Sequence, residues 1–99
     1  MIFAEYITAL RNAIRTNFGC ESVHLRTEQV ELIHNDTTVW EGRVESFALP
    51  SCEKGNQCYG WGIPREEGRM DYVTVLRVPP VTGPSKAVEA YLLGRHKSQ

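Results

Sequence analysis

The sequence contains no uninterrupted apolar segment of the roughly 18 residues that a membrane-spanning helix needs. Its first residues, MIFAEYITALRNAIRTNFG, carry an acidic residue at Glu5 and no basic residue before Arg11, so they lack the basic start and unbroken apolar stretch of a secretory signal. We therefore expect a cytoplasmic protein with no membrane association.

The sequence also lacks a surplus of positive charge. Eleven Lys and Arg stand against twelve Asp and Glu, which gives a formal net charge of −1. Domains that bind nucleic acid are usually strongly basic, so the overall charge argues against this class.

Cysteine is scarce and odd in number, with Cys20, Cys52 and Cys58. Cys20 and His24 are too far apart for a zinc knuckle, and Cys52 and Cys58 lack the usual two-residue gap. A Cys52–Cys58 disulfide would close the intervening loop, but the absent signal argues against it. We expect three reduced thiols, no metal and no cofactor.

Two segments have the spacing of helices. Apolar residues of the segment 2–17 recur every three or four positions, and Gly19 follows where a left-handed C-terminal cap forms most easily. Ser85 is placed to cap a second helix over residues 86–95.

Between these helices the apolar period falls to two, which predicts strands over residues 22–34, 37–49, 57–63 and 70–78. Because Phe47 and Leu49 alternate in step with the charged residues of the second strand, we expect a bulge or the end of the sheet near Gly42 or Ser46. Short connections favour an antiparallel meander of three or four strands. The predicted fold is one α+β domain over residues 1–99, a two-layer sandwich with both helices on the same face of the sheet.

Four aromatic residues fall in the predicted strands: Trp40, Tyr59, Trp61 and Tyr72. Both faces of the last strand are apolar, whereas a sheet covered by helices on one side needs only one apolar face. One interpretation is an ordinary core under the helices. The other is an exposed aromatic patch that forms an interface, with Trp61 and Tyr72 as its anchors.

A second candidate site surrounds the loop 50–58. There Cys52, Glu53 and Cys58, next to Tyr59, are candidates for a ligand pocket or for thiol-dependent catalysis, in which a base activates a cysteine nucleophile. No recognised nucleophile motif or phosphate-binding glycine loop accompanies them, and Gly60 and Gly62 are more typical of a bulge or a close backbone approach.

The order helix–strands–helix, with the residues Gly83-Pro84-Ser85-Lys86-Ala87 opening the last helix, resembles a double-stranded RNA-binding domain in outline. The resemblance implies binding through Lys86, Arg95, His96 and Lys97. Such domains use a basic cluster at this helix start, whereas Glu89 soon follows the single Lys86.

These observations favour a small protein-interaction module without catalytic machinery, whose partner is another protein or a second copy of the chain. A thin core with surplus apolar strand surface is stabilised when a partner covers it.

Overall fold

The computed structural model describes residues 2–97, and the side chains of residues 2–94. Two helices, α1 (Phe3–Phe18) and α2 (Pro84–Lys97), flank a sheet of the four strands β1 (Val23–His34), β2 (Thr37–Ala48), β3 (Gln57–Pro64) and β4 (Met70–Leu76). A short 3-10 helix (Glu66–Gly68) joins β3 to β4. The strands lie in the order β1-β2-β3-β4 and all neighbours are antiparallel, so the α+β class and the meander are confirmed.

Local signals end these elements where the sequence predicts. Gly19 adopts a left-handed conformation (φ 70°) and its N–H donates to the Arg15 carbonyl at 2.8 Å, which closes α1. Asn35 and Asp36 both have positive φ, 52° and 62°, as a two-residue hairpin turn requires. The second helix spans Pro84–Lys97, so it is longer than the predicted range 86–95, and Ser85 lies inside the helix instead of capping it.

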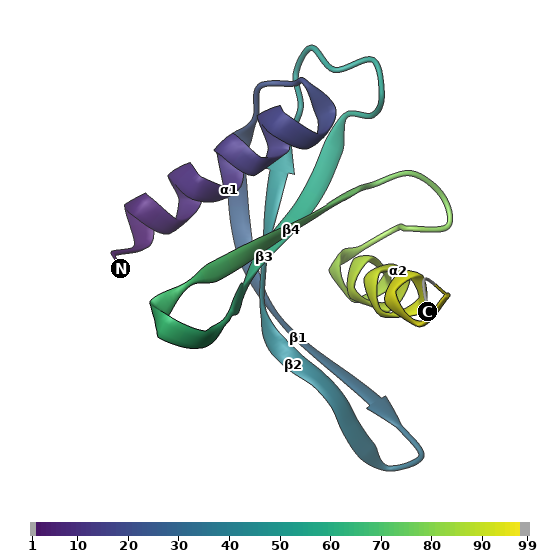
Figure 1. Ribbon diagram of the computed structural model, residues 1–99. Coiled ribbons are helices and arrows are strands. Elements are labelled where there is room, and N and C mark those ends of the chain that lie inside the picture. The colour runs from purple at the N-terminus through teal and green to yellow at the C-terminus, as the bar shows by residue number, and fades with distance from the viewer. Residues whose placement is uncertain (1, 98–99) are drawn as a thin grey trace.

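The two helices cover opposite faces of the sheet, not the same face as expected (Figure 1). Along β3, Cys58 packs in a cluster with Leu10 and Ile14 of α1. The next residue along the strand, Tyr59, packs in a second cluster with Val88 of α2. Because successive strand residues point to opposite faces, the two clusters lie on different sides of one sheet.

This arrangement explains why both faces of β4 are apolar: each has its own helix. It also explains why β3 has glycines on the face that α1 covers, where a larger residue would be too close to its neighbours. A Cβ atom at Gly60 would stand 3.1 Å from Leu10 Cδ2, and one at Gly62 would stand 2.8 Å from Met70 Sδ. These nearest atoms belong to side chains, and β3 pairs with β4 in a regular register, so the glycines make room for side chains and mark neither a bulge nor a close backbone approach.

An irregularity of the sheet lies beside Ser46, as expected, but its extra residue is in the neighbouring strand β1. The register shifts at Leu25, in β1 opposite the Ser46–Phe47 region, and again at Val39, early in β2. β2 itself is regular around Phe47, which faces α1. Most of the charged residues on the same face of β2 lie in the part of the strand that α1 does not cover. The face changes from buried to exposed because α1 covers only part of it.

β2 pairs with β3 only from Glu45 to Ala48, whereas it pairs with β1 along its whole length. The rest of the β1–β2 hairpin therefore extends away from the body of the protein as an arm (Figure 1). α2 packs against this hairpin, with contacts to β1 and β2. Among residues 2–97, no helix is both long and apolar enough to cross a membrane.

Candidate functional site

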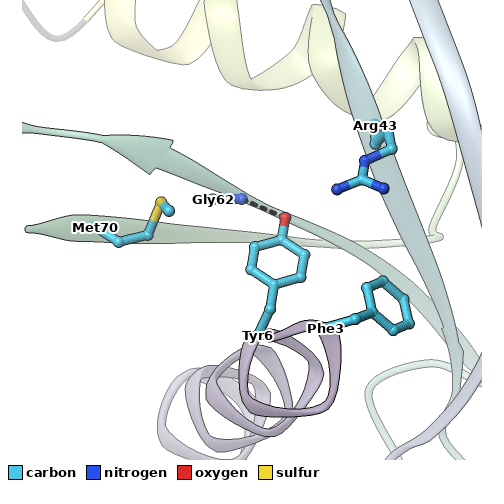
Figure 2. Close-up of a pocket in the computed structure, with 5 residues that line it drawn as sticks. All are labelled: Phe3, Tyr6, Arg43, Gly62 and Met70. Carbon is cyan, nitrogen blue, oxygen red and sulfur yellow. Dashed lines mark hydrogen bonds between the residues drawn. The ribbon is translucent and has the colours of Figure 1, made fainter. Parts of the chain in front are cut away.

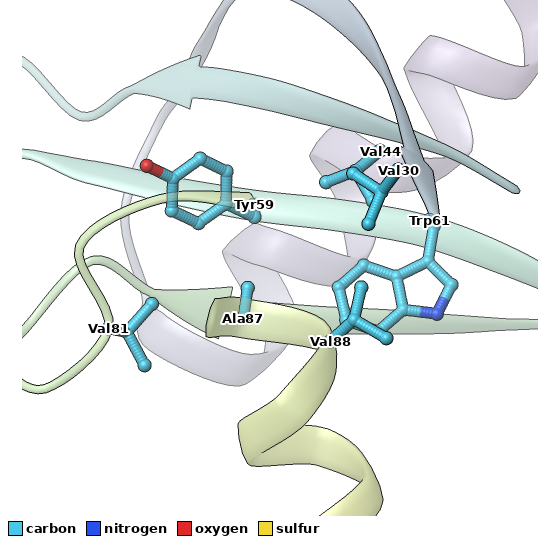
Figure 3. Packing of buried hydrophobic residues seen from close by; sticks show 7 residues of the cluster. All are labelled: Val30, Val44, Tyr59, Trp61, Val81, Ala87 and Val88. Carbon is cyan, nitrogen blue, oxygen red and sulfur yellow. The ribbon is translucent and has the colours of Figure 1, made fainter. Parts of the chain in front are cut away.

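The structure places the predicted aromatic anchors mainly in the core. Trp61 and Tyr59 are 1% and 3% exposed and pack against Ala87 and Val88 of α2 (Figure 3). They cannot form an exposed patch, so the interpretation of an ordinary core applies to these two residues. The expectation that Trp61 anchors an exposed interface is wrong, because it assumed that one sheet face was left uncovered.

The other two aromatic residues are half-buried and lie on different faces. Trp40 meets Trp61 edge to face at a centroid distance of 5.8 Å, and Tyr91 of α2 meets the other side of Trp61 at 5.7 Å. Tyr72 lies on the α1 face, 6.2 Å from the ring of Tyr6. Trp40 and Tyr72 therefore do not belong to a common surface.

A different apolar surface is formed where the arm meets α2. It surrounds a groove of about 400 Å³, which we call the arm groove, lined by Leu32, Ile33, His34, Val39, Glu89, Leu92 and Leu93. Three of its apolar side chains, Ile33, Val39 and Leu93, are each more than half exposed. Large apolar side chains grouped in this way are typical of an interaction surface.

The sequence places these side chains together through a bulge. Leu32 pairs with Trp40 but Ile33 pairs with Thr38, so Val39 is an extra residue in β2 with no partner opposite. Alternation alone would put Leu32 and Ile33 on different faces, yet both line the groove. The signal was present in the adjacent apolar pairs Leu32-Ile33 and Val39-Trp40, which break the period of two at the end of the hairpin.

The cysteines contradict the expectation of three reduced thiols. Cys20 and Cys52 form a disulfide between the end of α1 and the loop that follows β2. The pairing joins residues 32 positions apart, so spacing in the sequence gave no indication of it. Disulfides persist mainly in oxidising compartments, and the cytoplasmic location, expected from the absent signal, remains a prediction.

Cys58 is the free cysteine, and it is buried under α1. Burial raises the pKa of its thiol to about 12. It therefore carries almost no thiolate near neutral pH and is poorly suited to act as a nucleophile. Glu53 lines a small cavity beside Cys20, and neither Cys52 nor Cys58 is among the residues that line it.

A buried carboxylate lies on the α1 face of β2. Glu45 is fully buried, and its Oε1 accepts hydrogen bonds from the Thr27 hydroxyl and from His24 Nε2, the latter at 2.8 Å. Its Oε2 has no hydrogen-bond partner among the described residues. Such an unsatisfied buried oxygen is costly and is often found near a functional site. Within the described part of the chain, no group of three or more His, Cys, Asp or Glu is arranged to hold a metal ion.

The basic residues implied by the RNA-binding resemblance are only partly visible. Lys86 lies 3.6 Å from Glu89 one turn further along α2, which is typical of a solvated helix surface. The side chains of Arg95, His96 and Lys97 lie outside the described ones.

In comparisons with known proteins, no family model, no curated protein and no solved structure matches this chain.

Proposed function

We propose that this protein is a non-catalytic interaction module that associates with a second copy of itself through the arm groove. The observation that supports the proposal is the exposure of Ile33, Val39 and Leu93 side by side on three elements, β1, β2 and α2, that pack together. Burying these side chains in an interface would remove apolar surface from water, at about 25 cal/mol per Å².

A second copy is the partner that fits this surface most simply. A two-fold interface brings the same patch of both subunits together, and an apolar patch is complementary to itself. At the edge of the groove, His34 and Glu89 provide a hydrogen-bond donor and an acceptor that a two-fold axis can pair between subunits. The net charge of −1 sets no strong repulsion against such a dimer.

The test is the mass of the protein in solution across micromolar to millimolar concentrations, by sedimentation velocity. We expect the natural protein to form a dimer and the double variant Ile33→Ser with Leu93→Ser to remain a monomer with an unchanged circular dichroism spectrum. The matched control is Val23→Ser. Val23 lies in β1, as Ile33 does, and it is also more than half exposed, but it does not line the groove.

A natural protein that stays monomeric at millimolar concentration would contradict the proposal. So would a dimer that persists unchanged in the double variant, since its interface would then lie elsewhere. Dissociation by Val23→Ser alone would point to the β1 edge instead of the groove.

A further inference from the structure

A second hollow lies on the α1 face of the sheet, at the point where β2 and β3 separate. Their last paired residues on this side are Glu45 and Gly60, and beyond them the strands diverge beneath the first turns of α1. The resulting cavity of about 510 Å³, which we call the α1 cavity, is lined by Phe3, Tyr6, Arg43, Gly62 and Met70 (Figure 2). Its volume is in the range of pockets that bind small molecules.

Arg43 gives this cavity its chemistry. The side chain extends from β2 and its guanidinium is directed into the cavity (Figure 2). It makes no hydrogen bond or ion pair with any residue that the structure describes, so all of its N–H groups are available to a ligand. The planar guanidinium matches a carboxylate with two parallel hydrogen bonds.

The Tyr6 hydroxyl supplies a second donor opposite Arg43. Its oxygen accepts a hydrogen bond from the Gly62 N–H at 2.9 Å, which holds the ring in place and leaves its own proton free to be donated. Burial raises the pKa of Tyr6, the hydrogen bond from Gly62 opposes this rise, and Glu45 adds to it. The hydroxyl therefore stays protonated near neutral pH and donates to an anion.

Glu45 limits how much negative charge the cavity accepts. It comes two residues after Arg43 on the same face of β2, and its charge is felt at the Tyr6 hydroxyl together with that of Arg43. One positive group facing the cavity and one buried carboxylate behind it favour a ligand with a single negative charge over a doubly charged phosphate.

The remaining walls are apolar. Phe3 and Met70 stand on either side of Tyr6 and present a ring and a thioether to the cavity (Figure 2). Such walls favour a ligand with an apolar body next to its charged group.

From this arrangement we infer that the α1 cavity binds a small organic monocarboxylate with an aryl or branched alkyl body. The carboxylate is held by Arg43 and the Tyr6 hydroxyl, and the apolar body lies against Phe3 and Met70. This site is on the opposite face of the sheet from the arm groove and does not depend on the proposed dimer.

The experiment is a titration of the full chain with phenylacetate and with isovalerate, followed by the amide resonances of Gly62 and Met70 in two-dimensional NMR spectra at constant ionic strength. We expect saturable shifts of these resonances with both acids. The neutral amides of the same acids, phenylacetamide and isovaleramide, should give much weaker shifts because they carry no charge for Arg43.

Variants of the exposed Arg43 test the assignment without disturbing the core. Arg43→Gln should weaken binding of phenylacetate by about tenfold or more, as expected when a hydrogen bond to a charged group is lost. Arg43→Lys, which keeps the charge but not the planar fork, should bind with intermediate affinity. Arg11→Gln, a change of an exposed arginine of α1 that does not line the cavity, is the matched control and should bind as the natural protein does.

Three results would overturn the inference: neither acid shifts Gly62 or Met70, the acids and their amides bind equally well, or Arg43→Gln leaves the affinity unchanged. Inorganic phosphate that binds more tightly than either acid would also overturn it, because the single-charge argument from Glu45 would then be wrong.

Discussion

At the scale of single residues, the buried thiol of Cys58 ties the stability of the fold to alkaline pH. Its pKa is about 12 in the folded protein against an ordinary value of 9.0. The folded state therefore keeps a proton that the unfolded state releases. The stability that this provides is fully present below pH 9 and is lost as the pH rises from 9 towards 12.

We predict that between pH 8 and pH 10.5 the free energy of unfolding falls more steeply for the natural protein than for Cys58→Ala, by up to roughly 1.4 kcal/mol for each pH unit above 9. Urea unfolding at several pH values measures both slopes. Tyr6, whose pKa is also raised, is common to both proteins and cancels in the comparison. Equal slopes would contradict the prediction, and recovery on return to pH 8 is the control against disulfide exchange.

At the scale of elements, strand alternation predicted the meander but not the placement of the helices. The apolar stripe of α1 and the turn at Asn35-Asp36 are local features, and the structure contains them. Which face each helix covers depends on contacts between distant segments. The apolar residues on both sides of β4 were the available signal, since each uncovered apolar face needs its own helix.

Each of the two candidate sites likewise depends on how neighbouring strands pair. The arm groove depends on the bulge at Val39, and the α1 cavity depends on the divergence of β2 and β3 after Glu45. The adjacent apolar pairs Leu32-Ile33 and Val39-Trp40 indicate the first event, whereas nothing in the local sequence indicates the second. Arg43 and Tyr6 are 37 positions apart in the sequence, and only the crossing of α1 over the sheet brings them to one cavity.

The disulfide joins the end of α1 to the loop after β2. Because it closes a chain segment of 32 residues, its loss should increase the entropy of the unfolded state. We predict that the double variant Cys20→Ser with Cys52→Ser unfolds at lower urea concentration, with a stability reduced by about 2–4 kcal/mol.

A reducing agent provides the control for this disulfide. It should destabilise the natural protein to the level of the double variant and leave the double variant unchanged. The intact mass of the natural protein should rise by two hydrogens on reduction. A natural protein whose mass and stability do not respond to the reducing agent would contradict the pairing of Cys20 with Cys52.

At the scale of the whole molecule, the two helices are coupled through one strand. Alternate residues of β3 belong to the core under α1 and to the core under α2, so neither core can come apart without disturbing the strand that both share. Both tryptophans, Trp40 and Trp61, lie in or against the α2-side core, and Cys58 lies in the α1-side core. The two sides therefore carry separate natural reporters.

We predict that the two cores unfold in a single cooperative transition. In urea, tryptophan fluorescence and the reactivity of Cys58 towards a thiol reagent should change at the same midpoint. Leu10→Ala, which truncates a fully buried side chain of α1, should cost about 2–5 kcal/mol and lower both midpoints equally, although Leu10 lies across the sheet from both tryptophans. Glu5→Ala, an exposed change on the same helix, is the control and should move neither. A shift of the Cys58 transition that leaves the fluorescence transition in place would mean that α1 unfolds on its own, and that β3 does not couple the two faces.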